Sequence, residues 1–262
     1  MNRLASLAEE VEEIFRREPS LVRSSFPSLL VVGDTHGDVE STKNALKAAD
    51  ERGAAVVFLG DYVDRGPYQI ENITAVFERK KASPSTCILL RGNHETLAMN
   101  TYYGFLDTVV RRHGLNTYNA FLKAFTMMPY ALQHRDKVLC VHGGLPEGLE
   151  NVSQLESLPR GQEDPDDPLA MQLLWNDPRE GLKGFAESAR GGGALYFGED
   201  VFTEFMNRNG LSLTVRSHEP MPEGYRYFFN RRLLTVFSCR FYSVPPKAAL
   251  LTHRDVEILS LG

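Results

Sequence analysis

The sequence predicts an α/β fold in which a largely parallel β-sheet is buried on both faces. Apolar runs of strand length alternate with helical patterns over about the first 90 residues, and the runs at 29–32, 56–59 and 88–90 contain no polar side chain. Near-continuous apolar strands joined by helices are typical of parallel sheets that are covered on both sides.

The segments between these strands have helical spacing. Near the N-terminus, apolar residues recur every three or four positions, which predicts an amphipathic helix that ends by Pro19. Two more helices are expected, one running from Val39 toward Gly53 and one opened by Pro67. We expect residues 1–27 to pack as a helical segment on a single catalytic domain that spans residues 1–262.

The second half of the chain is predicted to hold a long loop and a second sheet. Helical patterns over residues 96–113 and 116–127 break at Gly114, and a strand follows at 138–141. Residues 145–167 are rich in Pro, Gly and acids, which predicts a surface loop with a solvated acidic run. We then expect a helix and five strands that form a sheet packed on the first, at residues 199–208, 211–215, 225–229, 233–237, 247–252 and 256–259.

Composition indicates an ordinary globular protein. The chain has 262 residues, of which 42% are hydrophobic, and its net charge of −5 argues against a nucleic-acid partner. No apolar run reaches the ~18 residues that a membrane span requires, so no membrane partner is expected. The cysteines Cys87, Cys140 and Cys239 lack metal-binding or disulfide spacing, which favours buried thiols and a cytoplasmic location.

Polar clusters follow four of the predicted strands. Asp34 and His36 lie in GDTHG after the first strand, and Asp61 lies in GDYVDRG after the second. RGNHE, which includes Asn93, and HGG, which begins with His142, follow two later strands. Because the carboxyl ends of parallel strands share one edge, these groups should meet in one crevice. Burying such a cluster without a cation would cost several kcal/mol per carboxylate, so the pattern predicts a metal site.

Seven ordered motifs carry a family resemblance. GDTHG, GDYVDRG, LRGNHE, HGG, LLWNDP, RSHE and the segment 237–242 stand in the order and approximate spacing of the phosphoprotein phosphatases. The chain therefore resembles this family of metal-dependent serine/threonine phosphatases, including the catalytic subunits of types 1 and 2A, from about Val11 to Tyr242. The resemblance implies the metallophosphoesterase (calcineurin-like) fold, with two mixed β-sheets in a sandwich flanked by helices.

The resemblance also implies a centre of two divalent metal ions. Asp34 and His36 would hold the first ion, Asp61 would bridge both, and the second would be held by Asn93, His142 and His218. A carboxylate can span cations ~3.5 to 4 Å apart. Ligands of mixed Asp, Asn and His type without thiolate suit manganese, our first choice, with iron, zinc or cobalt as alternatives.

The same resemblance assigns the catalytic roles. A hydroxide bridging the metals would attack the phosphorus atom directly. His94 would protonate the leaving alkoxide, and Asp64 would keep its imidazole protonated and oriented. The substrate phosphate would be bound by Arg65, Arg190, Asn93 and Tyr242. The sequence at 238–241 departs from the family's usual small, Pro-containing segment, which leaves substrate preference and inhibitor sensitivity open.

These features predict a protein serine/threonine phosphatase, a phosphoric monoester hydrolase that acts on phosphoprotein substrates. Its regulatory subunits and its preference among serine, threonine and tyrosine stay open. One alternative is a dinucleoside tetraphosphate hydrolase, which shares the metal ligands; Asp64, RGNHE and LLWNDP favour the protein phosphatase. Another alternative is a non-catalytic phosphoprotein-binding module, which the complete set of expected ligands argues against. His113, His134 and His253 match no motif and are expected to be surface or packing residues.

Overall fold

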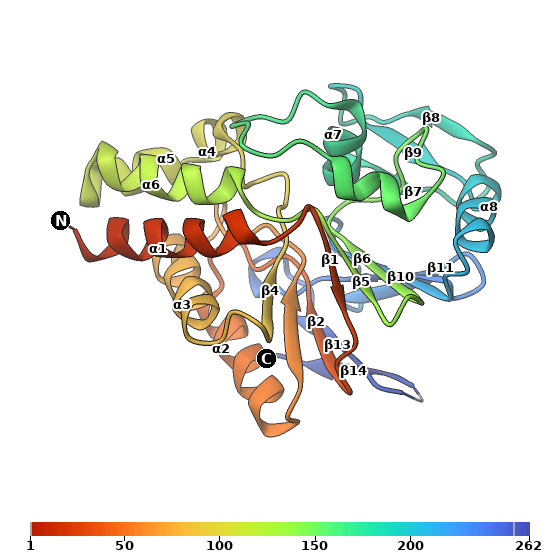
Figure 1. Ribbon diagram of the computed structural model, residues 1–262, viewed down its shortest axis with the longest axis horizontal. Helices are drawn as coiled ribbons and strands as arrows, with labels where there is room; N and C mark the ends of the chain where they lie inside the picture. Colours follow the sequence, from red (N-terminus) through yellow and green to blue (C-terminus); the bar gives the residue numbers. More distant parts are fainter. Residues whose placement is uncertain (1, 254) are drawn as a thin grey trace.

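Two β-sheets pack face to face in the computed structural model, which describes residues 2–253 and 255–262 (Figure 1). The five-stranded sheet has the order β14 (Val256–Ser260), β13 (Lys247–Leu251), β2 (Leu29–Val32), β3 (Ala55–Phe58) and β4 (Cys87–Leu89). The six-stranded sheet has the order β1 (Leu21–Ser24), β5 (Ala131–His134), β6 (Val138–Val141), β10 (Leu213–Arg216), β12 (Leu233–Val236) and β11 (Tyr225–Phe228). A small third sheet contains β7 (Asp177–Pro178), β9 (Leu195–Phe197) and β8 (Phe185–Glu187).

Each large sheet is mixed, as the resemblance implied. β2, β3 and β4 are parallel, whereas β13 runs antiparallel to β2 and to β14. The expectation that all C-terminal strands form the second sheet was therefore wrong, because the last two strands extend the first sheet. The chain returns to β2 through the pairing of Ala248 with Val32, which no local pattern in the sequence encodes.

Alternation along β2 explains why the first sheet is buried on both faces. Leu30 and Val32 face a core shared with helices, and Leu29 and Val31 face a core shared with the second sheet. Successive side chains of a strand point to opposite faces, so a strand buried on both sides is apolar throughout. The predicted covering on both faces is confirmed, with helices on one side and a sheet on the other.

Helices cover the outer face of each sheet (Figure 1). On the first sheet lie α1 (Arg3–Arg17), α2 (Val39–Glu51), α3 (Gln69–Ala82), α5 (Phe105–His113) and α6 (Leu115–Thr126), with the short α4 (Leu97–Tyr103) beside the site. On the second lie α7 (Pro168–Trp175), α8 (Glu199–Arg208) and the 3₁₀ segment η1 (Val152–Ser157). Among the described residues, none of the helices is long and apolar enough to cross a membrane.

The N-terminal helix α1 forms as its periodicity predicts. The Asn2 side chain accepts a hydrogen bond from the Leu4 amide and so caps the helix, and Ala8, Val11 and Phe15 are buried. The Phe15 ring lies 6.1 Å from that of Phe77 on α3, edge to face. The apolar face of α1 therefore packs on the helices that cover the first sheet.

Two local predictions need correction. The helix expected at 96–113 is interrupted at Gly104, whose φ of 98° no helical residue adopts, so α4 and α5 are separate. The acidic run at 163–167 is not simply solvated. Asp164 accepts from the Ala98 amide at the start of α4, and Asp167 accepts from the Ala170 amide at the start of α7. These carboxylates satisfy helix N-termini, where negative charge is favoured.

Candidate metal centre

The six predicted metal ligands meet at one edge of the two packed sheets. Each side chain is buried, and the most exposed, His218, has only 7% of its surface accessible. They come from loops that follow five strands: Asp34 and His36 follow β2, Asp61 follows β3, Asn93 follows β4, His142 follows β6 and His218 follows β10. The structure therefore brings together every ligand that the resemblance implied.

The first group is formed by His36 and two carboxylates. His36 Nε2 lies 3.7 Å from Asp34 Oδ2 and 3.5 Å from Asp61 Oδ2. The other ring nitrogen, Nδ1, donates to the Val63 carbonyl at 2.9 Å. A carbonyl can only accept, so neutral His36 presents the Nε2 lone pair to both carboxylates.

The second group is formed around His142. Its Nδ1 donates to the Leu59 carbonyl at 3.1 Å, which leaves the lone pair on Nε2. That Nε2 lies 2.9 Å from Asn93 Oδ1, 3.4 Å from Asp61 Oδ1 and 3.2 Å from His218 Nδ1. Asp61 thus turns one carboxylate oxygen toward each group.

These groups fit a pair of cations. Each brings buried carboxylate oxygens and imidazole nitrogens within 4 Å of one another. Asp34 Oδ2 and His218 Nε2 are buried without a hydrogen-bond partner in the described structure. Burial raises the pKa of Asp34 to about 6, and burial together with the Asp34 charge raises the pKa of Asp61 well above its usual range. Cations would offset this cost by attracting the carboxylates and the lone pairs.

Several residues at this edge have strained backbone. His36, Asp61, Asp64, Arg65 and His218 all have positive φ, from 39° to 71°. Non-glycine residues rarely adopt this region, and it persists where surrounding contacts over-determine it. Here the turns position the side chains of His36, Asp61 and His218 among the other ligands.

Two buried groups behind the ligands hold them in place. Glu95 accepts hydrogen bonds from the amides of Asp61 at 2.7 Å, Tyr62 at 2.9 Å and Gly92 at 3.0 Å. Ser217 Oγ contacts Asp34 Oδ1 at 2.5 Å. Our sequence reasoning assigned neither residue a role, although Glu95 stands in RGNHE and Ser217 in RSHE. Their position within motifs was the signal that could have found them.

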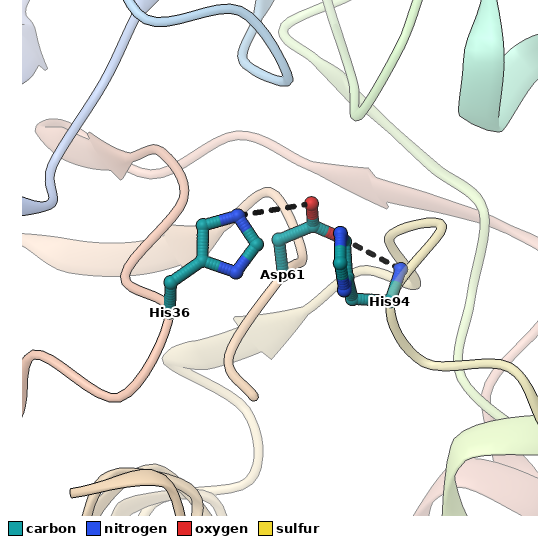
Figure 2. A group of neighbouring side chains, drawn as sticks. All are labelled: His36, Asp61 and His94. Carbon is teal, nitrogen blue, oxygen red and sulfur yellow. Dashed lines mark hydrogen bonds and ion pairs between the residues drawn. The ribbon is translucent and has the colours of Figure 1, made fainter. Parts of the chain in front are cut away.

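His94 lies beside the first group and is paired with Asp64. Its Nδ1 is 2.8 Å from Asp64 Oδ2, and its ring meets that of His36 edge to face with centroids 4.7 Å apart. In Figure 2 the imidazoles of His36 and His94 lie on either side of the Asp61 carboxylate, which also accepts from the His94 amide at 2.9 Å. His36, Asp61 and His94 offer ligand atoms within 4.8 Å of one another. His94 is therefore an alternative to Asp34 as a candidate ligand of the first ion.

The surroundings of His94 bear on whether it binds a metal ion or transfers a proton. Its Nδ1 is already bonded to Asp64, which is itself held by the Phe105 amide at 3.0 Å and by Asn100 at 3.3 Å. Burial lowers the pKa of His94 well below its usual range, with Arg65 and Arg190 adding to it, and burial raises the pKa of Asp64 to about 7. A carboxylate bonded to one imidazole nitrogen orients the ring and leaves the other nitrogen to exchange a proton.

Two arginines lie near enough to the ligand groups for their charges to act on them, Arg65 on His36 and Arg190 on Asp34. The Arg65 guanidinium lies 4.0 Å from the ring centroid of Tyr103 and 6.0 Å from that of Tyr242. Arg190 donates from Nε to Asp177 Oδ2 at 2.6 Å, the one hydrogen bond that the described structure gives its guanidinium. The two Nη groups of Arg190 have no hydrogen-bond partner among the described residues.

Comparison with known families decides the classification. The profile of the family described as calcineurin-like phosphoesterase matches residues 27–222. The chain belongs to the calcineurin-like phosphoesterases. Members of this family use a dinuclear metal centre, and the two groups that share Asp61 are the candidate ligands for it in this chain.

Solved structures of phosphoesterases support this placement. A Saccharomyces cerevisiae protein serine/threonine phosphatase with similarity to human phosphatase PP5 superposes with a TM-score of 0.88 at 29% identity, covering 98% of this chain and 88% of that one. The resemblance to phosphoprotein phosphatases is thus borne out. A cold-active protein-tyrosine phosphatase from a psychrophilic Shewanella has a TM-score of 0.66 at 17% identity, covering 95% and 84%. A protein described as a putative diadenosine tetraphosphatase has a TM-score of 0.52 at 16% identity, covering 92% and 98%. At these lower identities the likeness shows the fold alone.

The structure adds residues to the phosphoesterase site that sequence reasoning missed. Asp177 lies between Arg190 and Arg216, accepting from Arg216 Nη2 at 2.7 Å. The Trp175 ring meets the His218 ring with centroids 5.7 Å apart, and Tyr103 covers Arg65. Asp177 and Trp175 stand in LLWNDP, whose role was left unassigned, whereas Tyr103 had no signal in the spacing.

Proposed function

We propose that this calcineurin-like phosphoesterase is a protein serine/threonine phosphatase that hydrolyses phosphoserine and phosphothreonine monoesters. The observation that carries the proposal is the Asp64–His94 pair, which lies beside the carboxylate shared by both ligand groups. A serine or threonine alkoxide is a poor leaving group, so a proton donor at this place favours such substrates. The 29% identity to the yeast serine/threonine phosphatase supports the same assignment.

The ligand groups would hold two divalent cations, for which we propose manganese. Asp34 and His36 would bind one ion, Asp61 both, and Asn93, His142 and His218 the other. Bound cations would supply an activated water for hydrolysis and would neutralise charge on the phosphoryl group. The chain contributes rigid positions for the ligands and the hydrogen bonds to Val63 and Leu59 that fix their tautomers.

The remaining residues bind the phosphate and move the proton. The planar guanidinium groups of Arg65 and Arg190 can each donate two hydrogen bonds to phosphate oxygens. Asn93 and Tyr242 complete the phosphate site; burial raises the pKa of Tyr242 above its usual range, so the phenol stays a donor. His94 Nε2 would deliver its proton to the leaving oxygen, while Asp64 orients the ring through Nδ1.

The test compares two substrates on metal-stripped protein with Mn²⁺ added back. A phosphoserine/phosphothreonine peptide and a diadenosine tetraphosphate are assayed side by side, with Asp61→Asn as the inactive control. Metal-dependent turnover of the peptide alone is expected. Turnover of the nucleotide alone would move the assignment to the dinucleoside tetraphosphate hydrolases. No turnover of either, with phosphopeptide binding retained, would favour a non-catalytic binding module.

Phosphoproteins are the substrates we propose, and the cytoplasm is the location we propose. A phosphotyrosine peptide included in the same assay measures the preference that the metal centre leaves open. Serine/threonine activity should exceed tyrosine activity on peptides of matched sequence.

A further inference from the structure

The loop between β12 and β13 carries Tyr242 on a 3₁₀ turn, η2 (Arg240–Tyr242). The Tyr242 ring stacks on the His36 ring with centroids 5.5 Å apart and meets the Phe237 ring at 5.0 Å. Arg240 stands in this loop, two residues before Tyr242. Arg240 therefore raises the question of what holds the loop in this chain.

Arg240 is fastened to one buried carboxylate. Its Nη2 lies 2.8 Å from Asp38 Oδ1, its Nε lies 3.0 Å from Asp38 Oδ2, and its backbone amide donates to Asp38 Oδ2 at 2.9 Å. The Asp38 side chain is fully buried, while that of Arg240 is 35% exposed. A second contact joins Arg240 Nη1 to exposed Glu40 at 2.9 Å. A planar guanidinium bound to two carboxylate oxygens fixes both distance and orientation.

Asp38 connects the Arg240–Asp38 ion pair to the metal centre. It follows His36 by two residues and caps α2, accepting from the Ser41 amide at 3.2 Å and the Ser41 hydroxyl at 2.8 Å. The segment that positions His36 and the loop that positions Tyr242 are thus joined by one carboxylate, although 202 residues separate Asp38 from Arg240.

At the start of the loop, the Ser238 amide donates to the Asp34 carbonyl at 3.1 Å and the Ser238 hydroxyl accepts from the Gly33 amide at 2.9 Å. Beyond Ser238, the loop has few polar contacts with other segments. Within the part of the chain that the structure describes, every hydrogen bond or ion pair from residues 239–245 to another segment goes to Asp38 or Glu40. The bond from the Ser243 amide to the Arg240 carbonyl at 3.3 Å is internal to the turn. Ser243 itself has a positive φ of 58°.

We propose that Arg240 and Asp38 are positioning residues that hold Tyr242 over His36 and thereby set the affinity of the site for phosphomonoesters. Arg240 acts through Tyr242, since its own charge is already paired with Asp38 and Glu40. This inference rests on phosphoester hydrolysis and deepens the proposed function without depending on a protein substrate.

The test measures kcat and KM for p-nitrophenyl phosphate in the full chain with Mn²⁺. Four variants are compared with the wild type: Arg240→Ala, Arg240→Lys, Tyr242→Ala and the double variant Arg240→Ala/Tyr242→Ala. Arg79→Ala is the matched control, because Arg79 is also a partly buried arginine (22% exposed) paired with an aspartate, Asp50 at 2.5 Å, but lies away from the site. Amide hydrogen exchange over residues 239–245 gives a reading that needs no turnover.

Arg240→Ala should raise KM about tenfold with kcat within about twofold, and Arg240→Lys should restore part of the loss. In the Tyr242→Ala background, removing Arg240 should change kcat/KM by less than about twofold, because the two residues act as one unit. Exchange over 239–245 should quicken in Arg240→Ala and stay unchanged in Arg79→Ala.

Three results would overturn the proposal: additive effects of Arg240 and Tyr242, an unchanged KM with only a lowered melting temperature as in Arg79→Ala, or unaltered exchange over 239–245. Hydrolysis of p-nitrophenyl phosphate without hydrolysis of phosphopeptides would contradict the proposed serine/threonine function and leave this test intact. A chain that turns over neither substrate is still judged by the exchange measurement.

Discussion

The proposed metal-ligand side of the site and its proposed substrate side are held in different ways. On the ligand side, loops are bonded to each other through their backbones: the amides of Thr35 and His36 donate to the Asp61 carbonyl at 3.0 and 2.9 Å, and Glu95 accepts from three further amides. These contacts are buried and all involve backbone amides, three of which donate to the single carboxylate of Glu95. The ligand geometry is therefore part of the sandwich itself.

On the substrate side, loops are held by individual ion pairs. Arg190 is held by Asp177, and the loop of Tyr242 is held by Arg240 against Asp38. Arg190 precedes a Gly-rich turn in which Gly191 and Gly192 have positive φ. The difference indicates that metal binding and substrate binding can be altered separately, the first through strand-end residues and the second through single side-chain pairs.

The largest effect is expected for Asp61→Asn, which changes the carboxylate that both ligand groups share. An amide has one oxygen ligand and no charge, so it cannot serve both groups, and turnover should fall by at least ~10⁴. Metal content, measured by plasma mass spectrometry on the purified variant, should fall with it. Near wild-type turnover with two bound ions would contradict the role of Asp61 as the shared ligand.

The next largest effect is expected for His94→Asn, which tests whether His94 belongs to the metal-ligand side or to the substrate side. If His94 moves a proton and does not hold a metal, turnover of a phosphopeptide should fall by ~10² to 10⁴ while metal content survives. The matched comparison is His36→Asn, which should lose metal as well as turnover. Loss of one ion in His94→Asn would instead make His94 a ligand of the first group.

Glu95→Gln should have a smaller effect and tests whether the ligand side depends on its backbone bonds. Glutamine keeps one acceptor oxygen but turns an amino group toward the amides that Glu95 now accepts from. We expect metal affinity to weaken ~10- to 100-fold, with a lower melting temperature, as for other changes behind metal ligands. Competition with a metal indicator measures the first, and differential scanning calorimetry the second. An unchanged affinity would mean that the ligands hold their positions without Glu95.

The same contrast explains what the sequence could predict. Asp34, Asp61 and His142 follow apolar strands, and the C-terminal ends of parallel strands lie at one edge of a sheet. The apolar pattern of the sequence was therefore enough to predict that these side chains meet. The polar strands β1 and β5 were missed because they have no continuous apolar run: Arg23 and Gln133 lie within them. They form through pairing with each other across the chain.

Contacts on the substrate side were beyond local pattern for a related reason. The Arg240–Asp38 pair joins residues 202 apart, and nothing in either neighbourhood marks the other as its partner. Asp177 stood in a motif that was recognised, yet its contacts with Arg190 and Arg216 arise only once β7, β9 and β10 are assembled. Ion pairs of this kind depend on tertiary geometry, whereas strand ends depend on sequence periodicity.

The smallest effect is expected for Asp177→Asn, which loosens the substrate side alone. Asp177 accepts hydrogen bonds from Arg190 at 2.6 Å and from Arg216 at 2.7 Å. An asparagine side chain has one acceptor oxygen and no charge, so it can accept from only one of the two arginines. Arg190 should then sample other directions, so KM for a phosphopeptide should rise ~10-fold while metal content and kcat change little.

A suitable control for that variant is Glu180→Gln, which removes charge from an exposed pair with Arg226 at 2.6 Å. Because exposed pairs contribute little, its KM and melting temperature should match the wild type. If Asp177→Asn lowers metal content as strongly as Glu95→Gln does, then Asp177 supports metal binding as well as substrate binding. The two sides of the site would then not be independent at Asp177. A rise in KM with full metal content would place the boundary between the two sides at the Arg190–Asp177 pair.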